Sequence, residues 1–185
     1  MRIISGELRG RRLNPPANLP VRPTTDLARE SLFNILRNKV EFSELEVLDL
    51  FAGIGSISFE FISRGVKSVT SLDINPKCID FIKESSIKLE VNNLYPIKSD
   101  AFVFLGKSQI SYDLVFADPP YDLKQFDIIP DLILKSFVRP GGMLIMEHAK
   151  EHKFVDNKYF IEQRNYGKVN FSFFQIPLEF SFNSL

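Results

Sequence analysis

The alternation of short apolar runs with amphipathic segments between residues 46 and 147 most strongly limits what this chain can fold into. Each apolar run is followed by a segment whose apolar residues recur at helical spacing. Such alternation is typical of a parallel sheet covered by helices, because parallel strands need crossover connections long enough to hold a helix. The expected strands are 47–51, 68–74, 95–99, 112–117 and 143–147.

The segments between and after these strands complete the predicted α/β fold. A β-hairpin over 160–165 and 169–176 ends the pattern and supplies one antiparallel strand. Before the sheet we expect a short hairpin (2–13), a proline-rich extended stretch, and a helix that opens at Thr24-Thr25-Asp26 and runs to about Asn38. Leu27, Leu32, Ile35 and Leu36 form the predicted apolar stripe of that helix. The expected helices of the sheet region are 56–63, 76–90, 101–107 and 125–137, the last stopped by residues 139–142.

Length and composition indicate one globular domain. The chain has 185 residues, 44% of them hydrophobic, including 18 phenylalanines, which is enough to bury a core. We divide it into a basic hairpin and linker (1–23), a helix (24–40), a core (46–176) and a tail (177–185). No apolar run approaches the roughly 18 residues that span a bilayer and the first residues form no signal peptide, so a cytoplasmic protein is expected.

The zero net charge of the chain hides an asymmetry. Residues 1–40 contain eight Lys and Arg against three acids, a net charge of +5, and the remaining residues carry −5. A basic segment on a mildly acidic body is consistent with a polyanionic partner, or with a solvated arm that has no partner.

A distinctive sequence, Ala117-Asp118-Pro119-Pro120-Tyr121, follows the fourth expected strand. The two prolines fix φ and lack an N–H, so the turn is stiff and its carbonyls stay available as acceptors. With the Asp118 carboxylate and the Tyr121 ring, this turn can hold a planar group that carries an NH2 and stack on its face. The alternative is a polar loop in which Pro-Pro only breaks the strand.

A glycine loop, Phe51-Ala52-Gly53-Ile54-Gly55, follows the first expected strand. Its glycines allow positive φ and a close approach of the backbone to a ligand at the start of the next helix. A nicotinamide dinucleotide site requires a third glycine or alanine where this chain has Ser58, so the loop argues against that cofactor.

Three aspartates accompany the glycine loop. Asp73 ends the second expected strand 18 residues after Gly55, near the spacing at which an acid binds ribose hydroxyls; a helix cap before Asn75 is the alternative. Asp100 ends the third expected strand and can accept a hydrogen bond from an adenine amino group. Asp49, inside the first strand, is either a buried structural acid or part of the pocket.

In this order, the glycine loop, the two strand-end acids and the Asp-Pro-Pro-Tyr sequence resemble the S-adenosyl-L-methionine-dependent amino-methyltransferases. The resemblance implies a Rossmann-like class I fold, with a seven-stranded, mostly parallel sheet that contains one antiparallel strand. It also implies S-adenosyl-L-methionine as methyl donor, S-adenosyl-L-homocysteine as product and no metal.

Further segments resemble the RsmD family, bacterial methyltransferases that act on the N2 amino group of a guanine in 16S ribosomal RNA. They are R-I-I-S-G (2–6), R-G-R-R-L (9–13), R-P-T-T-D (22–26), R-E-S-L-F-N (29–34), Glu147-His148 and Tyr166-Gly167. The chain departs from the family at Tyr121, where relatives often carry Phe, in the short segment 149–159, and in its Phe-rich tail. The family implies an assembled small ribosomal subunit as substrate and a monomeric cytoplasmic enzyme.

The strand-end positions and the resemblance together predict three groups of site residues. The catalytic residues are Asp118, Pro119, Pro120 and Tyr121. The cofactor-binding residues are Asp49, Phe51, Ala52, Gly53, Gly55, Asp73, Ile74, Asp100, Ala101, Thr24 and Thr25. The RNA-binding residues are Arg9, Arg11, Arg12 and Arg22. Thr24, Thr25 and Arg29 are expected to cover the methionine end of the cofactor, and helix capping and a surface charge are alternatives of equal weight.

Three other functions are alternatives at this point. An adenine-N6 DNA methyltransferase also uses Asp-Pro-Pro-Tyr, but this chain has no separate sequence-reading domain. A non-catalytic nucleotide-binding module is another alternative, and the intact Asp118 and Tyr121 argue against it. A glutamine-modifying methyltransferase is expected to carry Asn in place of Asp118.

The remaining reactive side chains are expected to be structural. Cys78 has no base placed beside it and is predicted to pack as a small apolar residue. His148 and His152 have no third ligand in the sequence pattern, which argues against a metal site. Glu147 ends the fifth strand, and we expect a structural acid rather than a pocket residue there.

Overall fold

A computed structural model describes residues 1–16, 19 and 25–178 of the chain. Its elements in chain order are α1 (Asp26–Leu36), the 3-10 helix η1 (Phe42–Glu44), β1 (Glu46–Leu50), α2 (Ser56–Ser63), β2 (Ser68–Asp73), α3 (Pro76–Lys88), β3 (Leu94–Lys98), α4 (Ala101–Lys107), β4 (Tyr112–Ala117), the 3-10 helix η2 (Phe126–Ile128), α5 (Ile129–Ser136), β5 (Val138–His148), β6 (Phe160–Tyr166) and β7 (Val169–Gln175).

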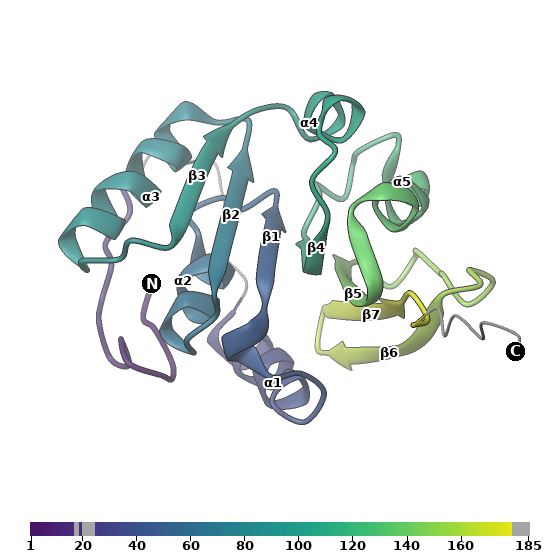
Figure 1. Ribbon diagram of the computed structural model, residues 1–185, viewed down its shortest axis with the longest axis horizontal. Coiled ribbons are helices and arrows are strands. Elements are labelled where there is room, and N and C mark those ends of the chain that lie inside the picture. The colour runs from purple at the N-terminus through teal and green to yellow at the C-terminus, as the bar shows by residue number, and fades with distance from the viewer. Residues whose placement is uncertain (17–18, 20–24, 179–185) are drawn as a thin grey trace, which may run out of the picture.

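The seven strands form one sheet in the order β3-β2-β1-β4-β5-β7-β6 (Figure 1). Neighbours from β3 to β5 pair in parallel, whereas β7 pairs antiparallel with both β5 and β6. The predicted fold class, a mostly parallel seven-stranded sheet with one antiparallel strand, is therefore confirmed. The strand order reverses between β1 and β4, which lie side by side at the centre.

Helices cover both faces of the sheet, and each face has its own apolar core (Figure 1). Helices α1, α2 and α3 pack against the face that presents Val47, Leu114 and Ile145. Helices α4 and α5 cover the other face, which presents Leu48 and Leu144. Successive residues of a strand point to opposite faces. Strand β4 therefore carries apolar residues at five of its six positions, and β1 buries Val47, Leu48 and Leu50, as strands covered on both faces require.

The N-terminal segment folds back onto the helices instead of forming two regular strands. An isolated antiparallel bridge joins Arg2 to Arg12, and the terminal ammonium of Met1 donates to the Leu13 carbonyl over 2.9 Å. Ile3 and Leu13 are buried against the α1–α3 core. The expected hairpin over 2–13 is thus present in outline, with its two apolar residues as anchors.

Helix α1 differs from its prediction in its ends and in one residue of its stripe. It begins at Asp26, because the Thr25 side chain accepts a hydrogen bond from the Ala28 backbone N–H and so caps the helix, and it ends at Leu36. Leu27 was predicted to belong to the apolar stripe, but 71% of its surface is exposed. The buried apolar positions are Ala28, Leu32, Phe33 and Leu36, spaced by four, one and three residues, so the buried face excludes Leu27.

The predicted helix 125–137 and the predicted strand 143–147 also have different bounds. The helix is divided into η2 and α5, with Pro130 in the first turn of α5, where a missing N–H has no helical partner to lose. Strand β5 begins at Val138 and includes the residues expected to form a stop. A register shift opposite Tyr112 and Leu114 accommodates this stretch, in which Gly141 has φ of 80°.

Within the described residues, the longest apolar helical stretch is too short to cross a lipid bilayer.

Burial of the central strands predicts that alanine substitution of two isoleucines of the sheet changes the free energy of unfolding by very different amounts. Ile145 in β5 is fully buried, whereas Ile161 in β6 is 43% exposed. We expect Ile145→Ala to lower the free energy of unfolding by about 2–5 kcal/mol, since it removes buried methylene groups and leaves a cavity. Ile161→Ala, the control, should cost no more than about 1 kcal/mol. Urea unfolding monitored by circular dichroism measures both values, and equal losses would contradict this assignment of the core.

Candidate active site at the carboxyl ends of the strands

A cavity of about 750 Å³ opens at the carboxyl ends of β1, β2, β4 and β5. This is the edge at which parallel α/β sheets bind ligands, and it includes the point where the strand order reverses. The volume lies in the range typical of small-molecule sites. The predicted site residues in its wall are Thr25, Asp49, Phe51, Ala52, Gly53, Asp73, Ile74, Asp100, Ala101, Asp118, Pro119, Pro120 and Tyr121.

The glycine loop after β1 has a left-handed backbone at three positions. Phe51, Gly53 and Gly55 have φ of 69°, 54° and 75°. Phenylalanine pays roughly 1–2 kcal/mol for this conformation, and such outliers gather at functional sites. The loop is also attached to β2, because the Ala52 N–H donates to the Leu72 carbonyl over 2.8 Å.

Gly55 is the predicted loop residue that does not line the cavity. It caps α2 with its left-handed backbone. A Cβ at this position would lie 3.0 Å from Ile82 Cγ1 and 3.3 Å from the Phe59 ring. Its role is therefore in the turn and in the packing of α2 against α3.

Asp73 at the end of β2 organises the loop. One carboxylate oxygen accepts the Gly53 N–H over 2.8 Å and the other accepts the Asn75 N–H over 2.8 Å. Each carboxylate oxygen has a further lone pair, so Asp73 keeps acceptor capacity for a ligand in the cavity. The cap proposed as the alternative role belongs to Asn75, whose side chain accepts from the Lys77 N–H.

Asp49 is almost fully buried in β1, at 1% exposure, beneath the cavity. The Ser58 hydroxyl donates to its carboxylate. Because that hydroxyl has a single hydrogen, Ser71 must donate to Ser58 in turn. Burial raises the pKa of Asp49 to about 7, the Asp73 charge adds to the increase, and the hydrogen bonds from Ser58 oppose it. Ser58, the departure from the dinucleotide pattern, thus supports a buried acid.

Asp100 both caps a helix and lines the cavity. One oxygen of its carboxylate accepts the Phe102 and Val103 N–H groups over 2.9 and 3.0 Å at the start of α4. The second oxygen has no such role in the cap. Asp100 can therefore position α4 and accept a hydrogen bond from a ligand.

The Asp-Pro-Pro-Tyr turn closes the cavity at the end of β4. The Asp118 N–H donates to the Leu50 carbonyl over 3.3 Å, so the turn is tied to β1. Tyr121 is 46% exposed, and its ring meets the Phe126 ring edge to face with centroids 6.4 Å apart. The turn thus presents a carboxylate, a carbonyl without neighbouring N–H groups and a flat ring to one space.

Glu147 is a wall residue that we expected to be structural. Ala117 pairs with Met146 in the parallel ladder of β4 and β5, so Asp118 and Glu147 follow at matching positions on neighbouring strands. Glu147 is 4% exposed. Burial places the pKa of Asp118 well above its ordinary value, and the charges of Glu147 and Asp49 raise it further.

Other wall residues come from segments that carry no motif. Lys168 and Val169 reach the cavity from the turn between β6 and β7, and Phe116 and Leu123 flank the Asp-Pro-Pro-Tyr turn. Strand pairing between distant parts of the chain brings these residues to the cavity. Apart from the turn at Gly167, no local sequence pattern predicts this.

Three predicted RNA-binding residues lie outside the cavity. Arg9, Arg11 and Arg12 are exposed on the N-terminal hairpin. Arg22 and Thr24 fall outside the described residues. Arg29, for which a surface charge was one alternative, is instead 1% exposed.

The expected structural residues take plain roles. Cys78 is buried in α3. His148 contacts the Ser172 hydroxyl through Nε2, and His152 stacks on Phe126 at 3.9 Å between centroids. In the part of the chain that is described, no group of three or more His, Cys, Asp or Glu residues is arranged to hold a metal ion.

Comparisons with known proteins connect this site to a family. Residues 1–175 match the family described as "Conserved hypothetical protein 95". Ribosomal RNA small subunit methyltransferase D of Buchnera aphidicola subsp. Baizongia pistaciae is 34% identical over 150 residues, which cover 80% of this chain and 75% of that protein. The protein of the same name from Haemophilus influenzae is 30% identical over 182 residues, covering 95% and 93%. A solved structure described as the putative methyltransferase yhhF from Escherichia coli superposes with a TM-score of 0.83 at 26% identity, covering 97% of this chain and 99% of that one.

The raised pKa of Asp49 predicts how stability depends on pH. The folded protein holds the proton up to about pH 7, whereas an unfolded aspartate releases it near pH 3.8. Between these values the folded state binds more protons, so the Asp49 contribution to the free energy of unfolding falls as pH rises. Asparagine cannot ionise. Asp49→Asn should therefore gain stability relative to the unmodified protein between about pH 4 and 7, by roughly 4 kcal/mol at most.

Urea unfolding at several pH values measures this difference. The exposed Asp80 supplies the control variant, Asp80→Asn. A constant difference between Asp49→Asn and the unmodified protein across this pH range would contradict the assignment.

Proposed function

The chain belongs to the family of ribosomal RNA small subunit methyltransferase D, and we propose that it transfers a methyl group from S-adenosyl-L-methionine to the N2 amino group of a guanine in 16S ribosomal RNA. The observation that carries this proposal is the Asp-Pro-Pro-Tyr turn, which faces the same cavity as the glycine loop and Asp73. A cavity with both features can bring an amino group and a nucleoside-linked methyl donor together.

The wall of the cavity fits S-adenosyl-L-methionine. Asp73 would accept hydrogen bonds from ribose hydroxyls, and Asp100 would accept one from the adenine amino group; both line the cavity. Asp49 lies deeper, where its ionised form, present above about pH 7, would favour the positively charged methyl donor, and Thr25 lines the same cavity. The donor, when bound, supplies a methyl group on a positively charged sulfur and leaves as S-adenosyl-L-homocysteine, a reaction that requires no metal.

Asp118 and Pro119 would act on the amino group of the target base. The guanine amino nitrogen is a weak nucleophile, because its lone pair is delocalised into the ring. By accepting the two amino hydrogens, the Asp118 carboxylate and the Pro119 carbonyl favour a pyramidal nitrogen and aim its lone pair at the methyl group. The Asp118 charge also stabilises the positive charge that develops on nitrogen during transfer.

Tyr121 would hold the base from its face. The ring lies at the exposed side of the turn, and its edge contact with Phe126 limits its orientation. A base inside a helix cannot present its amino group to this turn, so the guanine must be unpaired or extruded.

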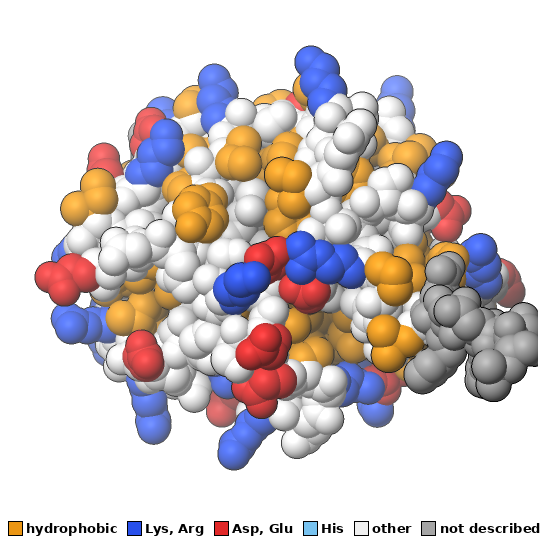
Figure 2. Space-filling view, in the orientation of Figure 1, with side chains coloured by type: hydrophobic (Ala, Val, Ile, Leu, Met, Phe, Trp, Pro, Cys, Tyr) orange, Lys and Arg blue, Asp and Glu red, His pale blue; other side chains and the backbone are white. Residues whose placement is uncertain are grey.

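The N-terminal hairpin would bind the RNA backbone. Arg9, Arg11 and Arg12 are exposed there, and arginine forms bidentate hydrogen bonds with phosphate. On the face seen in Figure 2, lysine and arginine side chains are interspersed with acidic ones and form no single basic patch. We assign the phosphate contacts to the exposed arginines of the hairpin, and binding should weaken as salt rises. We extend the proposal to an assembled small subunit as substrate, a cytoplasmic location and a monomeric enzyme, on the strength of family membership.

The role of Asp118 predicts a specific loss of chemistry. Asp118→Asn replaces a charged acceptor with a neutral amide, so kcat for methyl transfer to small-subunit RNA should fall about 10²–10³-fold. The dissociation constant for S-adenosyl-L-homocysteine should change little, because the donor site is intact. Asp122→Asn, in the exposed part of the same loop, is the matched control and should keep its activity. Equal activity in the two variants would overturn the catalytic assignment.

The raised pKa of Asp118 predicts a pH dependence of catalysis. A protonated Asp118 carboxyl has no negative charge with which to stabilise the positive charge that develops on the amino nitrogen. Burial keeps this carboxyl protonated to a higher pH than an ordinary aspartate. The value of kcat/KM should therefore rise with pH, by about tenfold per unit below this pKa, and then reach a plateau. A profile that is flat from pH 4.5 upward would show that the ionised form is not required.

A further inference from the structure

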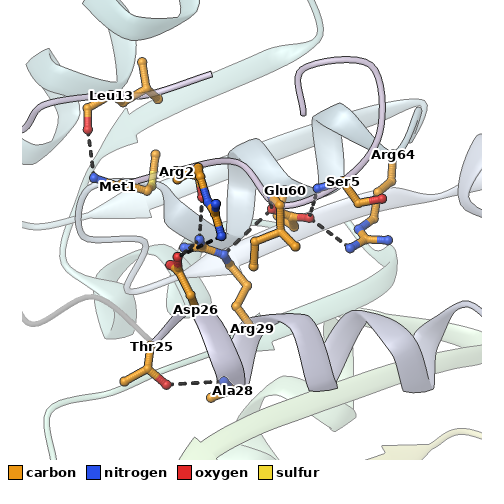
Figure 3. A network of polar contacts seen from close by, with 11 residues as sticks. Met1, Arg2, Ser5, Leu13, Thr25, Asp26, Ala28, Arg29, Glu60 and Arg64 are labelled. Atoms are coloured by element: carbon orange, nitrogen blue, oxygen red, sulfur yellow. Dashed lines mark hydrogen bonds and ion pairs between the residues drawn. The ribbon is translucent and has the colours of Figure 1, made fainter. Parts of the chain in front are cut away.

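The N-terminal hairpin is attached to the body through the far end of α2. Glu60 of α2 accepts the Ile4 and Ser5 backbone N–H groups, over 2.9 and 3.1 Å (Figure 3). One turn later, the Ser63 hydroxyl accepts the Leu8 N–H over 3.0 Å and donates to the Ser5 carbonyl. The Ser63 carbonyl also accepts the Glu7 N–H over 2.7 Å.

Two arginines complete this attachment around Glu60, which is itself fully buried. Arg64 donates to its carboxylate over 2.9 Å. The Arg29 Nε lies 3.7 Å from the carboxylate, and another nitrogen of the same guanidinium donates to the Arg2 carbonyl over 2.6 Å (Figure 3). Arg29 thus connects α1, α2 and the hairpin at one buried point.

A buried ion pair of this kind is poor evidence of a contribution to stability. The cost of removing two charges from water is often as large as their attraction, and apolar replacements are frequently as stable. The best-supported use of such pairs is to fix one arrangement among several, because a shifted partner would leave a buried charge without hydrogen bonds. Here the partner that is fixed is the hairpin backbone, which carries Arg9, Arg11 and Arg12 on its exposed side.

Helix α2 also begins at the candidate active site. Ser56 and Ile57 in its first turn line the cavity, directly after the glycine loop. Its eight residues span only about 12 Å. One short rigid element therefore joins the loop assigned to the methyl donor with the hairpin assigned to the RNA backbone.

We propose that Glu60 and Ser63 are positioning residues that hold the arginine-bearing hairpin, residues 1–13, at one fixed place relative to the methyl donor. The guanidinium groups then bind phosphates of the same RNA whose guanine enters the cavity. This inference rests on the proposed function. It adds that Glu60 and Ser63 set the distance between the phosphate contacts of the hairpin and the methyl donor.

Two glycines of the hairpin provide a matched test. Gly6 and Gly10 have nearly equal φ, 84° and 81°, so alanine imposes similar backbone strain at both. A Cβ at Gly6 would lie 1.7 Å from the Ser63 carbonyl oxygen, whereas a Cβ at Gly10 would meet nothing within 4 Å. Gly6→Ala must therefore move the hairpin away from α2, and Gly10→Ala need not.

The kinetic constants for small-subunit RNA distinguish positioning from simple stability. Gly6→Ala should raise KM for RNA about tenfold or more, because displaced arginines lose phosphate contacts. It should leave kcat at saturating RNA, and the affinity for S-adenosyl-L-homocysteine, within about twofold, since the catalytic turn is untouched. Gly10→Ala keeps the hairpin attached to α2, so its KM for RNA should rise less than that of Gly6→Ala.

Two further variants keep the test decisive if Gly6→Ala does not fold, as judged by circular dichroism. Ser63→Ala removes the hydroxyl that bonds the Leu8 N–H and the Ser5 carbonyl, and Glu60→Gln keeps the shape of the side chain without its charge. Both should raise KM for RNA more than kcat falls, even where the thermal midpoint also drops.

Equal KM for RNA in the Gly6→Ala and Gly10→Ala enzymes would overturn the positioning role, and so would a lower thermal midpoint in Ser63→Ala with KM unchanged. In both cases the proposed function would stand, provided that the unmodified enzyme methylates RNA and Asp118→Asn does not. Failure of the unmodified enzyme to methylate any RNA would instead overturn the proposed function.

Discussion

The parallel pairing of β1 with β4 is the constraint on which the rest of this structure depends. The chain leaves these two strands toward opposite edges of the sheet, so their crossover connections separate and leave a space above the strand ends. The glycine loop, Asp73 and the Asp-Pro-Pro-Tyr turn each follow a strand that ends at this edge. Motifs separated by up to 70 positions in the sequence therefore share one cavity, because the strands that precede them end at the same edge of the sheet.

The charges of the cavity explain why the site suits a cationic ligand. Asp49, Asp73, Asp118 and Glu147 all line it, and burial together with mutual repulsion raises the pKa values of Asp49 and Asp118. Ionised acids held this close destabilise the free protein. A positively charged methyl donor offsets that repulsion when it binds, and a nitrogen that becomes positive during methyl transfer does the same. The acids that line the cavity therefore favour both positively charged species.

Local sequence patterns predicted most of the elements and the site residues at strand ends. Helices α2 and α4 and strand β4 have the bounds that periodicity and capping residues indicated. The failures share one cause, which is dependence on distant parts of the chain. Glu147 reaches the cavity through its pairing with the end of β4, and Arg29 is buried because the hairpin folds over it. Leu27 is exposed because the position of the sheet, not hydrophobicity alone, decides which face of α1 is covered.

The most direct test of this account locates the transferred methyl group. Unmodified small ribosomal subunits, free 16S RNA and duplex DNA would each be incubated with the enzyme and labelled S-adenosyl-L-methionine, and the labelled nucleoside identified by mass spectrometry. The account predicts label at N2 of a single guanine of the RNA, with more label in the assembled subunit than in free RNA. Label at N6 of adenine in DNA, or no label in any substrate by an enzyme that binds the donor, would contradict it.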